Sequence, residues 1–293
     1  MNLLEIRRMV ESCLSTAKGQ VVNDVAIMSR ASGSASGLPF EEWTKNKLNE
    51  CGFKTFLQEE YLLEVVRELK EKGHSNSQIE RIIRDTWWGT SNYMISRNQL
   101  NHAFNQHALN QNDPPAYQQS IADIILFYGN DLVDNINDIV AINVKSHNLD
   151  RPSRDPNIIS AKRIIDYMKD ILETKPSIID KVNLWFIGIY YRQSSGYASI
   201  EEIYIKDFFR LDVKKIPTIN FDAAIQIQWH VKDMVELESQ DKLTFIESLA
   251  EEFNKRWVEF VDRRTASIEE TLNTLRTLIK KYRNKKTLFD YMV

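Results

Sequence analysis

Two apolar stretches decide the fold: Asp123-Ile-Ile-Leu-Phe-Tyr128 and Ile139-Val-Ala-Ile-Asn-Val-Lys145. Each is short and rich in β-branched and aromatic side chains, which is typical of buried strands. Gly129-Asn130-Asp131 follows the first stretch and predicts a turn. The two stretches therefore predict neighbouring strands of one sheet.

The rest of the chain predicts helices before and after further strands. Pro39 stands where the first turn of a helix tolerates proline. We expect one α/β domain over 1–293, a mixed sheet flanked by helices, with helical N- and C-terminal regions. The elements predicted from periodicity and turn residues are helix 2–28, loop 29–37, helix 40–51, two helices in 57–86, helix then loop in 92–120, helix 157–173, strands 184–191 and 200–205, an extended segment 217–231, and helices from about 240 to 283.

The composition is that of an ordinary globular protein and leaves the class of partner open. Of the 293 residues, 43% are hydrophobic and 27% are charged, and the formal net charge is -3. This balance does not indicate nucleic acid, although a large enzyme can hold DNA in a local cleft. The two cysteines exclude a disulfide scaffold and a four-cysteine zinc site. No apolar run suffices for a membrane span and the N-terminus is charged too early for a signal peptide, so we expect a cytoplasmic protein without a membrane partner.

The residues that suggest chemistry lie on the two deciding strands. Asp123 begins the first strand, and Asn143 and Lys145 lie near the end of the second. Side chains alternate along a strand, so positions 143 and 145 share a face, and a hairpin-like return brings that face beside Asp123. With an acid at 143, two carboxylates would bind one or two Mg²⁺ ions while the lysine supports the nucleophile. Aspartate followed by acid-x-Lys is the signature of the PD-(D/E)XK nucleases, and here the middle acid is an asparagine.

Three further segments carry a closer resemblance: Gly37-Leu-Pro-Phe-Glu41, Asp155-Pro-Asn-Ile-Ile-Ser-Ala161 and Ala223-Ala-Ile-Gln-Ile-Gln-Trp-His-Val231. They resemble, in the same order, segments of the HincII family of type II restriction endonucleases. The resemblance covers about 30–235, which we take as the catalytic core, and we do not extend it to the C-terminal helices. It implies a restriction-endonuclease-like fold with a central mixed sheet. It also implies an Mg²⁺-dependent homodimer that hydrolyses double-stranded DNA at a short palindrome.

The resemblance assigns roles to residues of the catalytic core. Asp123 and position 143 match the metal-binding acids, and Lys145 matches the catalytic lysine. Ser146 matches the small hydroxyl residue that follows the lysine. Glu41 lies where related enzymes keep a helix glutamate near the metal site, so it is a possible accessory residue.

The resemblance also implies DNA contacts. Arg154 stands where the family has a glutamine that wedges into the base stack, and Asn157 matches a base-reading asparagine. The Asn157 carboxamide carries a donor and an acceptor, which suits the N6 and N7 edge of adenine. Asn220 matches an asparagine of a second DNA-reading segment, and Thr218 replaces an aromatic residue there.

Plainer interpretations stand beside these assignments. Asn157 and Ser160 also fit the polar start of a capped helix. Gln226, Gln228 and His230 alternate with apolar residues in the manner of a half-buried strand. The basic run at 280–286 is typical of a solvated helix end, with phosphate contact as a second use.

Asn143 leaves three explanations open, because a neutral amide binds Mg²⁺ poorly. The chain is an engineered, inactivated form, or another acid supplies the charge, or it is a natural nuclease-like protein kept for DNA binding. Asp138 points to the opposite strand face, whereas Asp134 lies in the loop and is a candidate acid. The function hypotheses are therefore a restriction endonuclease inactivated at Asn143, a catalytically inactive DNA-binding protein of the same fold, and a helical-plus-sheet interaction protein without DNA contact.

Overall fold

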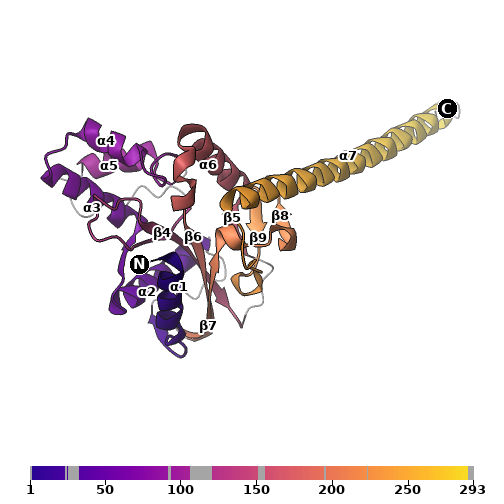
Figure 1. Cartoon of the computed structure of the whole chain (residues 1–293). Helices are drawn as coiled ribbons and strands as arrows, with labels where there is room; N and C mark the ends of the chain where they lie inside the picture. The colour runs from indigo at the N-terminus through magenta and orange to yellow at the C-terminus, as the bar shows by residue number, and fades with distance from the viewer. Residues whose placement is uncertain are drawn as a thin grey trace.

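A computed structural model describes residues 2–23, 25, 33–91, 94–105, 121–150, 156–194, 196–222 and 224–289. Its largest element is a six-stranded mixed sheet with the strand order β1-β7-β6-β4-β3-β2 (Figure 1). Only β4 and β6 pair in parallel, and the other neighbours pair antiparallel. The strands are β1 (Val21–Asn23), β2 (Lys54–Leu57), β3 (Ile124–Phe127), β4 (Ile139–Asn148), β6 (Leu184–Ser194) and β7 (Tyr197–Asp207).

A second, smaller sheet has three antiparallel strands in the order β5-β9-β8. These are β5 (Asn157–Ser160), β8 (Thr218–Asn220) and β9 (Gln226–Gln228). In this small sheet Ile158, Ile159, Ile219 and Ile227 are buried, whereas Asn157, Ser160, Thr218, Asn220, Gln226 and Gln228 are not. The small sheet therefore presents one polar face.

The helices cover both faces of the large sheet. Apolar residues of α1 and α2 pack on one face, against Val140, Ile142 and Val144 of β4. The opposite face is covered by α3, α4, α5, α6 and the start of α7. The bounds are α1 (Leu3–Ser15), α2 (Gly33–Glu50), α3 (Gln58–Glu71), α4 (Asn76–Arg84), α5 (Arg97–Asn105), α6 (Ala161–Thr174) and α7 (Lys242–Phe289). The expected mixed sheet flanked by helices, with helical N- and C-terminal regions, is confirmed.

The segment after β9 packs closely on the central sheet at a glycine. Gly188 of β6 pairs with Lys145 of β4, and a Cβ at Gly188 would lie 2.5 Å from the Cβ of Val231. Real side chains do not approach so closely, so only glycine accepts Val231 at this point. This contact sets the end of the small sheet beside the strand that carries Lys145.

Four predictions about local structure are wrong. The helix expected over 2–28 ends at Ser15, and 21–23 form strand β1 instead, because Val22 is buried against the edge of β7. The loop expected at 29–37 is helical from residue 33, and 29–32 lie outside the described residues. Pro39 is therefore inside α2 and not in its first turn.

The helix expected from 157 begins at Ala161, because 157–160 pair with β9 as a strand. The Ser160 hydroxyl caps this helix by accepting a hydrogen bond from the amide of Arg163 at 3.3 Å. Asn157 is thus a strand residue and takes no part in capping.

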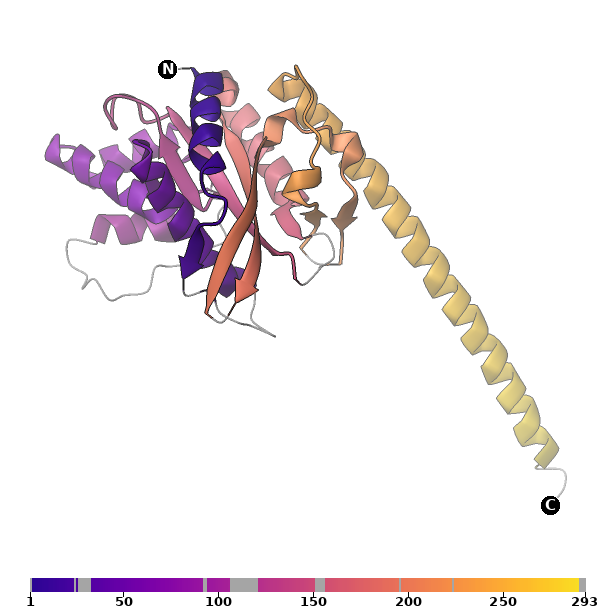
Figure 2. The same ribbon diagram turned by 90° about the horizontal axis from the view of Figure 1, so that it is seen from below.

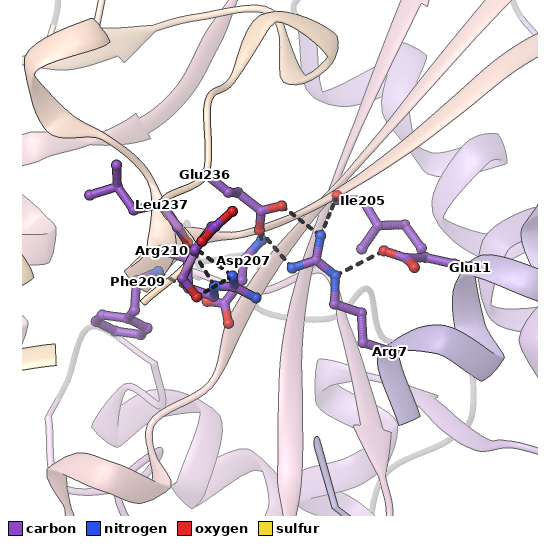
Figure 3. Close-up of polar contacts among 9 residues, drawn as sticks. Arg7, Glu11, Ile205, Asp207, Phe209, Arg210, Glu236 and Leu237 are labelled. Carbon is purple, nitrogen blue, oxygen red and sulfur yellow. Dashed lines mark hydrogen bonds and ion pairs between the residues drawn. The ribbon is translucent and has the colours of Figure 1, made fainter. Parts of the chain in front are cut away.

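Two covalent or charged links hold α1 to the body. A disulfide, which the sequence analysis did not predict, joins Cys13 of α1 to Cys51, the residue after α2. Figure 3 shows the second link, in which the Arg7 guanidinium donates to both carboxylate oxygens of Glu236 at 2.7 and 2.6 Å. Glu236 also accepts from the Asp207 amide at 2.7 Å, so it connects α1, β7 and the segment before α7.

Helix α7 leaves the body and projects far beyond it (Figures 1 and 2). Phe221 of the β8–β9 turn packs its ring on those of Phe253, Trp257 and Phe260 of α7. None of the described helices combines the length and apolarity that a membrane crossing requires.

Candidate active site

The base of the β3–β4 hairpin places Asp123 opposite Asn143. The register pairs Ile124 with Ile142, and one step further it sets Asp123 across from Asn143. The Asp123 amide donates to the Ile142 carbonyl at 2.9 Å, and the Val144 amide donates to Asp123 Oδ2 at 2.7 Å. The carboxylate thus takes a main-chain donor of β4 and is fixed against that strand.

Burial and neighbouring charge act on Asp123 in opposite directions. Burial raises the pKa of this carboxyl, while the charge of Lys145 and the bond from the Val144 amide lower it, with a net rise. A carboxyl group whose pKa is raised by burial, and which lies next to a lysine, is a recurrent feature of catalytic sites.

Asn143 is buried with only one half of its amide satisfied. The residue is 4% exposed. Nδ2 donates to the Ile121 carbonyl at 2.9 Å, whereas Oδ1 is a buried acceptor without a hydrogen-bond donor. An unsatisfied buried oxygen costs free energy, so this atom is suited to a donor or cation from outside the chain.

The second carboxylate of the site comes from α2. Burial, with the charge of Asp123 adding to it and that of Lys145 opposing it, raises the pKa of Glu41 to about 7. These mutual influences place Glu41, Asp123 and Lys145 in one electrostatic group. We call Glu41, Asp123, Asn143 and Lys145 the acid–lysine cluster.

The two other acids considered from the sequence lie elsewhere. Asp134 is in the turn at the far end of the β3–β4 hairpin, where it is exposed and 3.7 Å from the Lys72 ammonium. Asp138 pairs with Lys181 at 3.2 Å. β3 spans four residues, roughly 13 Å, between this turn and Asp123. The proposal that Asp134 supplies the missing charge is therefore wrong.

The donor set of the cluster fits a hard divalent cation. The described residues contain no group of three or more His, Cys, Asp or Glu side chains able to hold a metal. The cluster instead offers two carboxylates and the unsatisfied Asn143 Oδ1, and oxygen atoms of this kind are the ligands that Mg²⁺ takes. A cation between Glu41 and Asp123 would also relieve the repulsion that raises the Glu41 pKa.

The small sheet gathers three of the residues expected to contact DNA. Its pairing places Asn157, Gln228 and Thr218 in one row across β5, β9 and β8. Asn157 Oδ1 accepts a hydrogen bond from Gln228 Nε2 at 2.8 Å. The next polar row contains Ser160, Gln226 and Asn220, and Asn220 Oδ1 accepts from the Asp222 amide at 3.0 Å.

Gln226 and Gln228 are the residues whose placement the sequence analysis missed. They were interpreted only as the polar half of a strand, and the structure sets both on the same face as Asn157 and Asn220. The alternating pattern contained the signal for a polar face, but not the identity of the neighbouring strands.

The remaining expected residues are placed less closely together. Ser146 follows Lys145 on β4, is half-buried and pairs with Ile189 of β6. Arg154 lies outside the described residues. His230, interpreted as a core or surface histidine, packs its ring 4.5 Å from that of His147. Burial, together with the charge of His230, lowers the pKa of His147 to about 4.

A comparison with known families decides the classification. The model of the family described as restriction endonuclease HincII matches residues 14–282. The chain belongs to the HincII restriction endonuclease family. The match therefore supports a nuclease, that is, a DNA-binding hydrolase. No curated protein matches the sequence.

The HincII family match is wider than the part of the chain over which the short segments resemble the family. That resemblance was confined to about 30–235, whereas the family match extends to residue 282 and so includes most of α7. Within the HincII family match lie the whole acid–lysine cluster and all three strands of the small sheet. α7 therefore belongs to the family's pattern and is not an addition to it.

Proposed function

We propose that this chain is a sequence-specific endonuclease that acts as a homodimer on a short palindrome in double-stranded DNA and depends on Mg²⁺. We also propose that Asn143 keeps it in a weakly active or inactive form. The observation that carries the proposal is the mutual electrostatic influence of Glu41, Asp123 and Lys145, together with the buried Asn143 Oδ1 that has no hydrogen-bond donor. A homodimer follows most simply from the two-fold symmetry of a palindrome.

Asp123, Glu41 and Asn143 Oδ1 are the groups that would hold the cation. When bound, Mg²⁺ supplies a positive charge that polarises a phosphoryl oxygen and makes water a better nucleophile. Asp123 keeps its orientation because the Val144 amide donates to it. Glu41 of α2 would be the second carboxylate ligand, because a bound cation favours the ionised form of this carboxyl over the protonated form.

Lys145 lies next to both carboxylates and lowers the pKa of each. Its ammonium stabilises the negative charge that accumulates on the phosphate in the transition state and supports the attacking water. Asn143 contributes no negative charge, so the site holds one carboxylate fewer than an acid at 143 would give. We expect weaker cation binding and a slower reaction as a result.

The small sheet reads the base edges in this proposal. Asn157 Oδ1 accepts a hydrogen bond from Gln228 Nε2, which holds the two amides side by side. The pair together offers the Asn157 Nδ2 donor and the Gln228 Oε1 acceptor. A donor and acceptor side by side match the N7 and N6 edge of adenine, with Gln228 sharing the contact first expected of Asn157 alone.

A plasmid digest tests the catalytic part of the proposal. The chain and its Asn143→Asp variant are incubated with mixed-sequence plasmid and Mg²⁺, with Ca²⁺ and chelator as matched controls. We expect discrete fragments from Asn143→Asp in Mg²⁺ only, at a rate at least ~100-fold above the unchanged chain, the scale of restoring one group that stabilises transition-state charge. No cleavage by Asn143→Asp, with specific DNA binding intact, would contradict the nuclease activity.

A catalytically inactive DNA-binding protein is the second candidate, and one observation favours it. The Asn143 amide nitrogen donates to the Ile121 carbonyl, a bond that a carboxylate cannot make. Asn143 thus donates a hydrogen bond to the Ile121 carbonyl oxygen, whereas an ionised aspartate at this position would repel that oxygen. Under this alternative Asn143→Asp lowers stability, gives no cleavage and leaves DNA binding unchanged.

A further inference from the structure

The outer part of α7 is a long helix without a partner in the described part of the chain. The last recorded side-chain contact with the body is the ion pair of Arg264 with Asp222 at 2.5 Å. Every residue from 261 to 281 is exposed. Residues 265–289 continue the helix for about 37 Å, and Figures 1 and 2 both show it clear of the body.

An apolar seam follows this helix with alternating steps of three and four residues. Ile268 is 59% exposed and Leu275 is 50% exposed, although both are large and apolar. Six of the seven seam positions are apolar: Val258, Val261, Thr265, Ile268, Leu272, Leu275 and Ile279. A three–four alternation is the pattern of a coiled coil, in which each seam residue inserts between residues of a facing helix.

The opposite side of the helix carries no such seam. It bears the polar or small residues Ala266, Ser267, Glu270, Asn273, Thr274, Thr277, Lys280 and Lys281. Helices gain most of their stability from packing an apolar face against a neighbour. We therefore expect a single partner helix to pack along the seam.

The charges that flank the seam select a second copy of the same helix. Glu269 and Arg276 both lie on one flank, each directly after a seam residue. In an antiparallel pair with Leu272 facing Leu275 of the other copy, Glu269 of each copy meets Arg276 of the other. Because the pair is two-fold symmetric, the attraction between Glu269 and Arg276 occurs twice.

Other alignments of the same antiparallel pair bring like charges together. A shift by one heptad in one direction sets Glu269 against Glu269 of the other copy, and a shift in the other direction sets Arg276 against Arg276. Exposed ion pairs contribute little to the affinity of the dimer, but like charges in contact are unfavourable. The charges therefore determine how the two helices are aligned more than how tightly they bind. Arg264, which would serve a parallel pair, is already paired with Asp222 of its own body.

We propose that residues 258–279 of α7 form an antiparallel coiled coil with α7 of a second copy of this chain. The association requires neither DNA nor metal. It names the surface through which the proposed homodimer forms, and it stands whether or not the chain cleaves DNA.

Sedimentation of the full chain without DNA tests the interface. We expect a dimer for the unchanged chain and a monomer for Leu272→Glu/Leu275→Glu, with the dissociation constant raised roughly 100-fold or more because four buried leucines per dimer are lost. Asn273→Glu/Thr274→Glu is the matched control on the opposite side, and it stays dimeric. Unchanged melting of both variants shows that the body is folded, since these positions are exposed.

Charge reversal tests the register. Glu269→Arg and Arg276→Glu each weaken the dimer several-fold, and the double variant restores it. A dimer that survives Leu272→Glu/Leu275→Glu, or a chain that is monomeric until DNA is added, overturns the proposal. The second result would assign the helix to DNA. A stable dimer that fails to cut DNA counts against the nuclease proposal alone.

Discussion

The acid–lysine cluster and the small sheet differ in both burial and charge. In the cluster, Asn143 is buried, burial raises the pKa of both acids, and a lysine offsets their charge. The small sheet carries neutral amides and hydroxyls on its polar face, with an amide–amide contact between Asn157 and Gln228. Charged groups in a dry site act strongly on a reacting phosphate, whereas neutral amides discriminate by hydrogen-bond pattern. The comparison predicts that damage to the cluster removes chemistry and damage to the small sheet removes selectivity.

The largest effect is expected at Asp123. In the Asn143→Asp background, Asp123→Ala should abolish cleavage, because one of the carboxylates that hold the cation is lost. Calorimetric titration with Ca²⁺ should show a parallel loss of cation binding, and an unchanged melting temperature shows that the fold is intact. Undiminished cleavage by the double variant would remove Asp123 from the site.

Lys145 should separate chemistry from binding. Lys145→Ala is expected to slow cleavage by more than roughly 100-fold, the scale of losing one group that stabilises transition-state charge. DNA affinity should change little, since one charge is a small part of the total phosphate attraction. Single-turnover cleavage and a gel shift in Ca²⁺ measure the two quantities. Normal cutting with poor binding would mean that Lys145 only anchors the DNA backbone.

Asn157 and Gln228 should show the opposite separation. Each base contact contributes roughly 1–3 kcal/mol of discrimination, or about 5- to 150-fold. We expect Asn157→Ala to lower affinity for the cognate duplex by that range while non-specific affinity stays constant. Gln228→Glu keeps the size of the side chain but sets an acceptor against Asn157 Oδ1, so it should reduce the same discrimination. Equal weakening of cognate and scrambled duplexes would make Asn157 a phosphate contact.

The smallest effect concerns stability and pH. The pKa of Glu41 in the folded chain, about 7, lies above its ordinary value of 4.5. The folded chain therefore keeps the proton on Glu41 to a higher pH than the unfolded chain does. The free energy of unfolding contributed by Glu41 therefore falls as pH rises from about 4.5 to 7. Glu41→Gln removes this loss and should stabilise the protein at pH 8 by on the order of 1–3 kcal/mol, with a smaller gain at pH 5.

Thermal melts of Glu41→Gln at several pH values measure this effect, and Gln226→Ala in the small sheet is the control. The control has no titrating group, so its difference from the unchanged chain should not vary with pH. A stabilisation of Glu41→Gln that is equal at pH 5 and pH 8 would show that Glu41 keeps an ordinary pKa.

Glu236 illustrates an acid that follows the opposite rule. Burial alone would raise its pKa, but the hydrogen bonds from Arg7 and the Asp207 amide lower it overall. Its contribution to stability is present at neutral pH and is lost as pH falls through the lowered value. The partners of Glu236 are protein groups, whereas among the described residues no donor bonds the Glu41 carboxylate, which is left to a cation or a proton.

Local sequence patterns are sufficient to predict the central strands and the residues that they carry. Apolar runs and turn residues act over a few positions, so β3, β4, β6 and β7 and the shared face of Asn143 and Lys145 were predictable. The same local rules failed at 157–160, because pairing with β9 overrode a helical pattern. They also failed at residues 21–23, where the edge of β7 was available to pair.

Only the tertiary structure decided which residues meet across elements. It brought Glu41 of α2 to Asp123, set Gln228 against Asn157 and left the seam of α7 uncovered by the described body. It also placed Asp134 in the β3–β4 turn, at the end of the hairpin away from Asp123. The physical reason is that periodicity specifies which side of an element faces inward, whereas the neighbour it faces depends on how the whole chain packs.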